Sequence, residues 1–216
     1  MKKYTTVIFD MDGTLLNTLD DLKISVNYAL EKFNMPQRTL DEIRQFVGNG
    51  VLRLMELAVP QGMENPQFNE AFEVFKEHYS EHCNDNTGLY DGVYELVKDL
   101  YNKGYKLAIV SNKYYDAVVD LNKHYFSDYI EVAIGEKEGI RKKPAPDTVQ
   151  VALSMLDSTK EESVYIGDSE VDIQTAKNSG LDCISVSWGF RDPDYLKENG
   201  ATIIVDAPEK VSELLA

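Results

Sequence analysis

Two acidic residues at the end of a short apolar segment are the first candidates for chemistry in this sequence. Asp10 and Asp12 follow strand-forming residues that end at Phe9, and Gly13 comes next. Because side chains alternate faces along a strand, these aspartates can point the same way, about 7 Å apart. Carboxylates at the carboxyl end of a strand lie where open α/β sheets place their chemistry. Surface turns also use Asp and Gly, so this stretch alone leaves both interpretations open.

A second polar group follows a predicted strand at residues 105–110. Ser111, Asn112 and Lys113 come directly after it. A small hydroxyl followed by exposed backbone N–H groups suits a phosphate oxygen. Ser111 could instead be the N-cap of the helix predicted at 116–124.

A basic loop supplies the third candidate, Lys143. Pro144 and Pro146 fix the backbone beside it. Such rigidity indicates a lysine that is aimed at a target, whereas the alternative is a solvated basic loop before a helix.

A third strand end carries further carboxylates. Asp168 follows the predicted strand 163–166, and Asp172 lies one turn into the next helix, where it can face back toward Asp168. With Asp10 and Asp12 this gives up to four carboxylates at one edge of a sheet. Clustered carboxylates repel unless a cation joins them, and oxygen ligands suit Mg²⁺. A capped helix start would explain the Asp168 stretch alone, but not why several strands end this way.

The elements that position these groups fall into two patterns. Residues from about 18 to 85 are predicted to be helical, with a capping box of Thr39 and Glu42. After Thr87, helices alternate with short apolar strands, which indicates a parallel sheet covered by helices on both faces. The predicted strands are 5–9, 105–110, 131–134, 163–166, 183–186 and 202–205. The simplest architecture is one α/β domain with an all-helical insertion after its first strand.

In these four motifs the chain resembles the haloacid dehalogenase superfamily of phosphohydrolases. They occur in order as Asp10 to Thr14, Ser111 with Asn112, Lys143 before Pro144, and Gly167 to Asp172. The resemblance implies a Rossmann-like doubly wound core at 1–16 and 87–216 and a helical (C1-type) cap domain at 17–86. Within the superfamily, segments 47–51, 110–113 and 187–190 resemble the phosphoglycolate phosphatases.

The resemblance also implies roles for individual residues. Asp10 would be the nucleophile that forms an aspartyl-phosphate, and Asp12 would be the acid and base for the leaving group and the attacking water. Ser111 and Lys143 would hold and neutralise the transferring group. The implied phosphate site comprises Gly13, Thr14, Ser111, Asn112 and Lys143. An aspartate at position 12 also favours phosphate over halide chemistry.

The implied metal site takes Mg²⁺, with the ligands Asp10, the Asp12 carbonyl, Asp168 and Asp172 as an additional or supporting carboxylate. Arg53 follows the glycine turn of the predicted cap and could reach a substrate carboxylate. An ordinary surface arginine is an equal alternative for it.

Charge and composition limit the partners. The formal net charge of −15, from 37 acidic and 22 basic residues, argues against nucleic acid or an anionic membrane surface. Mg²⁺ and Lys143 would supply the local positive potential that an anionic substrate needs. Two cysteines and no long apolar stretch favour a reduced, cytoplasmic setting. We expect a small phosphorylated metabolite as substrate, and the oligomeric state stays open.

The leading functional hypothesis is a Mg²⁺-dependent phosphatase acting on a small phosphate monoester such as 2-phosphoglycolate. A sugar-phosphate mutase of the β-phosphoglucomutase type is the alternative enzyme. A non-catalytic binding protein on the same fold is the alternative from another class, although a pure scaffold has no need of these polar groups.

Overall fold

The structure is a computed structural model that describes residues 4–216. The chain divides into two compact units: an α/β unit, made of the segment up to Leu16 together with Leu89–Ala216, and a helical unit, Asn17–Gly88. Residues 1–3, which the sequence analysis assigns to the core, lie outside the described residues.

The α/β unit is built on a six-stranded sheet of order β5-β4-β1-β6-β7-β8. All of its pairings are parallel, as the alternation of strands and helices predicted. The strands are β1 (Thr6–Phe9), β4 (Lys106–Tyr114), β5 (Val132–Glu136), β6 (Ser163–Gly167), β7 (Asp182–Val186) and β8 (Ile204–Val205). The predicted α/β fold is therefore confirmed.

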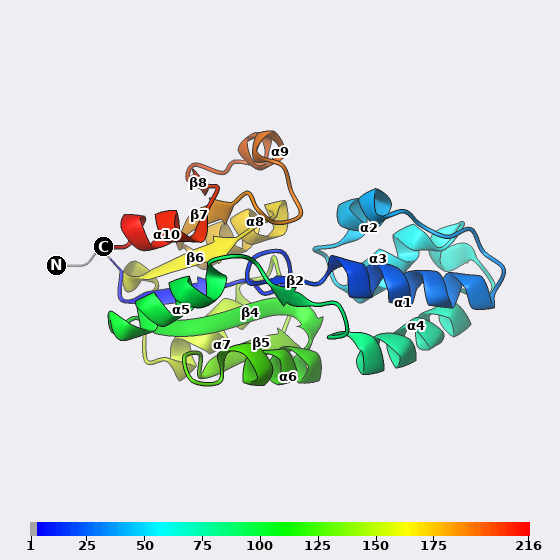
Figure 1. Ribbon diagram of the computed structural model, residues 1–216, viewed down its shortest axis with the longest axis horizontal. Helices are drawn as coiled ribbons and strands as arrows, with labels where there is room; N and C mark the ends of the chain where they lie inside the picture. Colours follow the sequence, from blue (N-terminus) through cyan, green and yellow to red (C-terminus); the bar gives the residue numbers. More distant parts are fainter. Residues whose placement is uncertain (1–3) are drawn as a thin grey trace. The chain divides into compact units, whose positions relative to one another are not determined.

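Helices cover both faces of this sheet, and alternate residues of β1 serve the two faces. Phe9 belongs to a buried cluster with residues of α5 (Val93–Asn102), α6 (Tyr115–Phe126) and α10 (Pro208–Leu214). Ile8 belongs to a second cluster with residues of α7 (Asp147–Met155) and α8 (Glu170–Ser179). Figure 1 labels these helices around the sheet.

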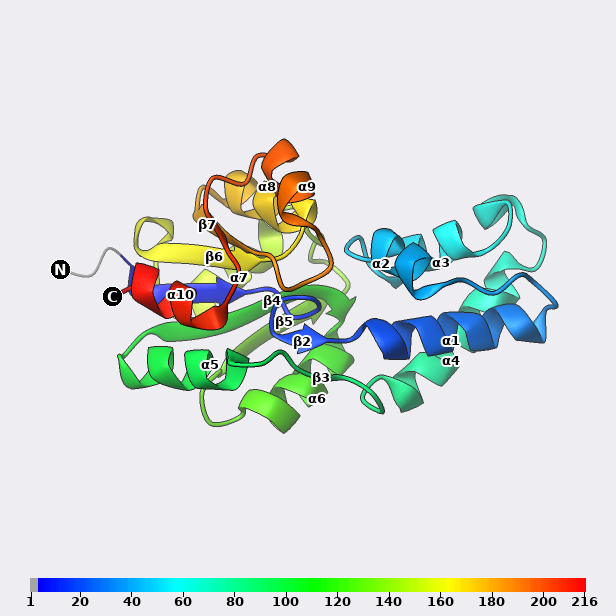
Figure 2. The same cartoon turned by 45° about the horizontal axis from the view of Figure 1, so that its top comes forward.

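The order of the strands creates a switch point beside β1. From β1 the chain continues to β4 and β5 on one side, and then returns to β6 and β7 on the other. Figure 2 shows β1 between β4 and β6. Open α/β sheets bind ligands beyond the carboxyl ends of the strands at such a point. The polar groups after β1, β4 and β6 meet there.

The helical unit contains only helices apart from its two connections to the α/β unit. The helices are α1 (Leu19–Lys32), α2 (Leu40–Phe46), α3 (Val51–Ala58), the 3₁₀ turn η1 (Gly62–Glu64) and α4 (Phe68–His82). Helices α1 and α4 lie side by side (Figures 1 and 2). The predicted capping box is present: Thr39 Oγ1 accepts from the Glu42 N–H, and Glu42 Oε2 accepts from the Thr39 N–H.

Some elements were not predicted. Two short strands, β2 (Leu16–Asn17) and β3 (Gly88–Leu89), pair where the chain passes between the units, and α9 (Pro193–Glu198) follows β7. Within residues 4–216, no helix has the length and apolar character needed to cross a membrane.

Candidate active site

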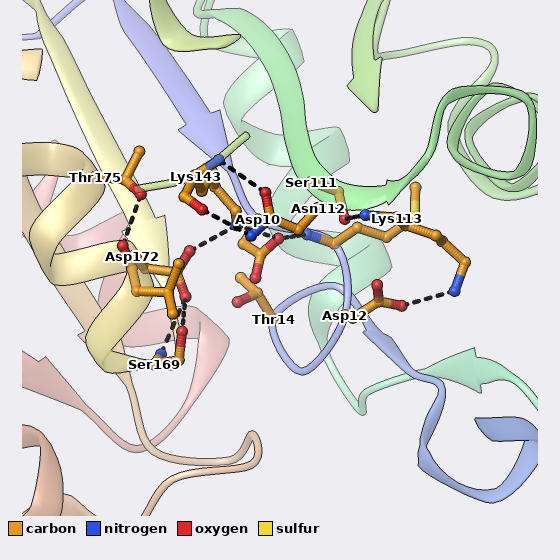
Figure 3. Close-up of polar contacts among 12 residues, drawn as sticks. Asp10, Asp12, Thr14, Ser111, Asn112, Lys113, Lys143, Ser169, Asp172 and Thr175 are labelled. Carbon is orange, nitrogen blue, oxygen red and sulfur yellow. Dashed lines mark hydrogen bonds and ion pairs between the residues drawn. The ribbon is translucent and has the colours of Figure 1, made fainter. Parts of the chain in front are cut away.

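Residues from three motifs meet around the ammonium group of Lys143. Lys143 Nζ lies 2.7 Å from Asp10 Oδ1 and 2.8 Å from Asp172 Oδ1. Asp10 follows β1, Lys143 lies in the loop before α7, and Asp172 is in the first turn of α8. All three residues are buried, and Figure 3 shows the three side chains converging. The lysine predicted to be aimed by its proline-rich loop thus points at two carboxylates.

Asp10 presents two different oxygens. Oδ1 accepts from the Met11 N–H at 2.7 Å and pairs with Lys143, whereas Oδ2 receives no hydrogen bond from residues 4–216. Burial and then the nearby Asp172 charge raise the pKa of Asp10 well above its usual range, and Lys143 opposes this. The contacts of Oδ1 therefore orient the carboxylate, and its second oxygen has no hydrogen bond within residues 4–216.

Lys143 is held by its backbone as well as by its charge. Asn112 Oδ1 accepts from the Lys143 N–H at 2.8 Å, and Asn112 Nδ2 donates to the Lys143 carbonyl at 3.1 Å. Burial by itself lowers the pKa of Lys143, but the carboxylates of Asp10 and Asp172 raise it above its ordinary value. The lysine is therefore a fixed positive charge.

Asp172 is saturated with partners. Its Oδ1 accepts from Lys143 and from the Tyr165 hydroxyl at 3.1 Å, and its Oδ2 accepts from the Ser169 N–H at 3.1 Å and the Ser169 hydroxyl at 2.6 Å. Tyr165, which Lys143 Nζ also contacts at 3.2 Å, was missed by the sequence analysis. A buried tyrosine usually needs a partner for its hydroxyl, so a tyrosine within the apolar strand β6 was the available signal.

Asp168 is packed against glycine. Its Oδ2 accepts from the Phe190 N–H at 2.7 Å, and its Oδ1 lies 3.4 Å from the Thr14 hydroxyl. A Cβ on Gly13, which has φ +87°, or on Gly189 would collide with the Asp168 carboxylate. Burial and the Asp172 charge raise the pKa of Asp168 to about 7. The fold thus places the Asp168 carboxyl against Gly13 in the loop that follows Asp10, although burial and the Asp172 charge disfavour its ionised form.

These carboxylates suit a metal ion. Oxygens of Asp10, Asp168 and Asp172 all lie within 4.8 Å of one another. When the three are ionised, Lys143 offsets only part of their charge, and a hard divalent cation would relieve the rest. Since Asp172 has its oxygens engaged, Asp10 and Asp168 are the better placed of the three to contact the ion.

Asp12 belongs to a separate arrangement. Lys113 Nζ lies 3.1 Å from Asp12 Oδ1, with the Lys113 side chain 2% exposed and that of Asp12 22% exposed. In Figure 3 this pair lies away from the Lys143 group. The backbone N–H of Lys113 donates to Ser111 Oγ at 3.2 Å. Ser111 lies within β4, and the N-cap of α6 is Tyr114. The alternative that Ser111 caps this helix is therefore wrong, because pairing with the sheet carries the strand past it.

The other predicted contacts have local roles in the structure. The Gly13 N–H donates to the Leu16 carbonyl at 2.8 Å, so this glycine allows close packing rather than offering a free N–H. The carbonyl of Thr14 accepts from Trp188 Nε1 at 3.0 Å. Arg53 lies on α3 and forms an exposed ion pair with Glu56 at 2.7 Å. The contacts with substrate predicted for these residues stay predictions.

Comparison with known proteins agrees with this geometry. The family model described as haloacid dehalogenase-like hydrolase matches residues 7–186. The chain belongs to this family. The match includes every residue of the two lysine–carboxylate arrangements, and it confirms the resemblance stated from the motifs.

Several relatives cover nearly the whole chain. Pyrophosphatase PpaX of Listeria innocua is 35% identical, over 99% of this chain and 96% of its own. A phosphoglycolate phosphatase of Vibrio vulnificus is 30% identical, over 97% of this chain and 92% of its own. The crystal structure of a candidate phosphoglycolate phosphatase from Lactobacillus delbrueckii subsp. bulgaricus superposes with a TM-score of 0.94 at 41% identity, covering 100% of this chain and 99% of that one. The likeness therefore extends through both units.

Proposed function

We propose that this chain is a Mg²⁺-dependent phosphatase that hydrolyses small phosphate monoesters through an aspartyl-phosphate on Asp10. One observation supports this most directly: Asp10 is buried and fixed through Oδ1, while Oδ2 is free of hydrogen bonds within residues 4–216. Lys143 lies beside it as a fixed cation, so charge on an incoming phosphoryl group is opposed from the outset.

The reaction has two balanced steps. Asp10 Oδ2 attacks phosphorus and the bond from phosphorus to the ester oxygen breaks, while Asp12 gives its proton to the departing alkoxide. Asp12 then takes a proton from water, whose oxygen attacks phosphorus, and inorganic phosphate leaves as the Asp10 carboxylate re-forms. Ser111 and the Asn112 backbone hold the phosphoryl oxygens, and positioning with electrostatic stabilisation supplies most of the rate.

The metal site fits this chemistry. Asp10, Asp168 and the Asp12 carbonyl would hold Mg²⁺, and Asp172 would support the site through Lys143 and Ser169. The bound ion would neutralise phosphate charge and align the phosphoryl group with the nucleophile. The family's phosphatases generally use a divalent metal, and a buried aspartate cluster is present here.

The substrate we propose is a small phosphorylated acid of the 2-phosphoglycolate type, as the names of several relatives suggest. Pyrophosphate is a second candidate, because a 35% identical relative over almost the whole chain is named a pyrophosphatase. We propose that residues 17–86 act as the cap that selects between them. Neither Cys83 nor Cys183 forms a disulfide within residues 4–216, in keeping with the cytoplasmic setting that we propose.

A substrate panel tests this function. Purified protein is assayed for phosphate release from 2-phosphoglycolate, pyrophosphate and β-glucose 1-phosphate, with Mg²⁺ and then with chelator. We expect Mg²⁺-dependent phosphate release from one of the first two. Conversion of β-glucose 1-phosphate to the 6-phosphate without phosphate release would establish the mutase alternative. No turnover of any of the three compounds with Mg²⁺ would favour a binding protein.

A further inference from the structure

A buried lysine outside the Lys143 network has no role in the reaction described so far. Lys113 is 4% exposed, although lysine is almost never fully buried unless it is paired. Lys106, the other lysine on β4, is exposed at the opposite end of the same strand. Ordering a long lysine side chain costs rotamer entropy, so a specific interaction must compensate for its position.

The partner of Lys113 is the carboxylate of Asp12, with Nζ to Oδ1 at 3.1 Å. The backbone around the lysine is fixed, since its N–H donates to Ser111 Oγ and β4 continues to Tyr114. Its neighbour Asn112 contacts the backbone of Lys143 instead. Adjacent residues of β4 thus contact different groups: Lys113 contacts Asp12, and Asn112 holds the backbone of Lys143. Side chains that alternate along a strand allow this.

The contact leaves the second oxygen of Asp12 available. Oδ1 is engaged by Lys113, and Oδ2 receives no hydrogen bond from residues 4–216. An aspartate side chain rotates about two bonds, so a carboxylate held at one oxygen presents the other in a defined direction. General acid catalysis requires this, because the proton must be within hydrogen-bond reach of the leaving oxygen.

We infer that Lys113 is a positioning residue for Asp12: its ammonium holds Oδ1 so that Oδ2 faces the leaving oxygen of the substrate. The inference rests on the acid/base role proposed for Asp12. Lys113 acts on the leaving-group side of the reaction, whereas Lys143 acts on the phosphoryl side. The effect of substituting Lys113 should therefore depend on the leaving group, whereas the effect of substituting Lys143 should not.

The test compares an alkyl phosphate with an aryl phosphate such as 4-nitrophenyl phosphate. An aryl oxide leaves readily without a proton, whereas an alkoxide needs one, so loss of a positioned acid slows the alkyl substrate selectively. Because kcat/KM reports the steps up to departure of the leaving group, for Lys113→Met we expect kcat/KM for the alkyl phosphate to fall by about 10- to 100-fold, with that for the aryl phosphate nearly unchanged. The later attack of water uses Asp12 whichever group has left, so any fall in kcat from that step is shared by the two substrates. Lys113→Arg, which keeps the cation, should recover most of the alkyl activity, and Lys106→Met serves as the matched control on the same strand.

A double-mutant cycle isolates the pair. If Lys113 acts through Asp12, adding Lys113→Met to Asp12→Asn should cause no further change in the alkyl-to-aryl ratio. The double variant also avoids leaving one unpaired buried charge, so it gives a reading even if the single lysine variant does not fold. Circular dichroism confirms the folded state of each variant.

Three outcomes would overturn the inference: an equal loss of kcat/KM with both substrates, no loss of kcat/KM for the alkyl phosphate, or a further selective loss in the Asp12→Asn background. A different result would identify a failure of the proposed function instead. If Asp12→Asn itself lowered kcat/KM for both substrates equally, Asp12 would not be the acid, and the positioning role of Lys113 would fall with it.

Discussion

Two lysine–carboxylate arrangements involve the aspartates that follow β1, and they differ in structure. Lys143 contacts Asp10 and Asp172 together, its backbone is clamped by Asn112, and Tyr165 bridges the group. Lys113 contacts Asp12 through one carboxylate oxygen, and the Asp12 side chain is 22% exposed. The first is a closed network of buried groups. In the second, which we call the open pair, the Asp12 carboxylate is partly exposed and Lys113 contacts one of its oxygens.

The difference matches the roles that we propose for the two carboxylates. A nucleophile has to approach phosphorus along one line, so contacts that hold Asp10 through Oδ1 would lower the barrier by preorganisation. An acid that also serves as a base must exchange a proton with two different oxygens, so its carboxylate needs an unbonded oxygen. The comparison therefore predicts a large, general loss from the first group and a selective loss from the second.

Asp10→Asn should have the largest effect. The amide nitrogen and weakly nucleophilic oxygen cannot form the aspartyl-phosphate, so we expect turnover to fall by at least about 10⁴-fold. The fold should be retained, because the side chain keeps its shape. Phosphate release under saturating substrate measures the loss, and Asp128→Asn, at an exposed loop position, is the control. Turnover within tenfold of the parent would exclude Asp10 as the nucleophile.

Lys143→Met should reduce activity by about 10²- to 10³-fold, since it removes a fixed charge from the phosphoryl group. In contrast to Lys113→Met, the loss should be the same for alkyl and aryl phosphates. It should also lower stability by roughly 3–5 kcal/mol, because Asp10 and Asp172 keep buried charge without their partner. Urea unfolding and the two-substrate assay measure both effects. A loss confined to the alkyl phosphate would contradict the proposal that Lys143 acts on the phosphoryl group and Lys113 on the leaving-group side.

The sequence could predict the closed network in outline but not in detail. Strand ends at Asp10 and Asp168 follow from the period of two and the apolar strands, and the sheet brings parallel strand ends to one edge. The saturation of Asp172 depends on Tyr165, whose residue type is ordinary for a buried strand. A tyrosine in an apolar strand indicates that its hydroxyl needs a partner, but it does not identify that partner.

The open pair of Lys113 and Asp12 could not be predicted from the sequence, for a different reason. Lys113 and Asp12 are separated by 101 residues and meet only through the register of β4 against β1. Local preference allowed Ser111 to begin a helix, whereas tertiary pairing extended the strand to Tyr114. Contacts set by register are decided by the whole sheet, so local patterns do not reveal them.

A smaller effect is expected from pH acting on the proposed metal site. Because the pKa of Asp168 is raised to about 7 without metal, the folded protein binds a proton there that the unfolded chain releases near pH 4. This group therefore makes the metal-free protein less stable as pH rises from about 4 to 7. Mg²⁺ competes with that proton, so the increase in Tm on adding Mg²⁺ should be larger at pH 8 than at pH 6.

Thermal unfolding with Mg²⁺ or chelator at the two pH values provides the measurement. Asp168→Asn removes the titrating group and should lose both the increase in Tm and its pH dependence. A Mg²⁺ effect that is the same at pH 6 and pH 8 in the parent protein would contradict the assignment of Asp168 as a ligand that must lose its proton.

The smallest effect should come from Tyr165→Phe, which keeps the ring and removes one hydroxyl from the closed network. Lys143 and Asp172 remain in direct contact at 2.8 Å, so the pair survives while its bridge is lost. We expect a stability loss of about 1 kcal/mol and a fall in kcat of roughly two- to fivefold for alkyl and aryl phosphates alike. Tyr101→Phe, at an exposed position on α5, is the matched control. If Tyr165→Phe instead slowed the alkyl phosphate alone, the hydroxyl would act on the leaving-group side, and the two lysine arrangements would be coupled rather than separate.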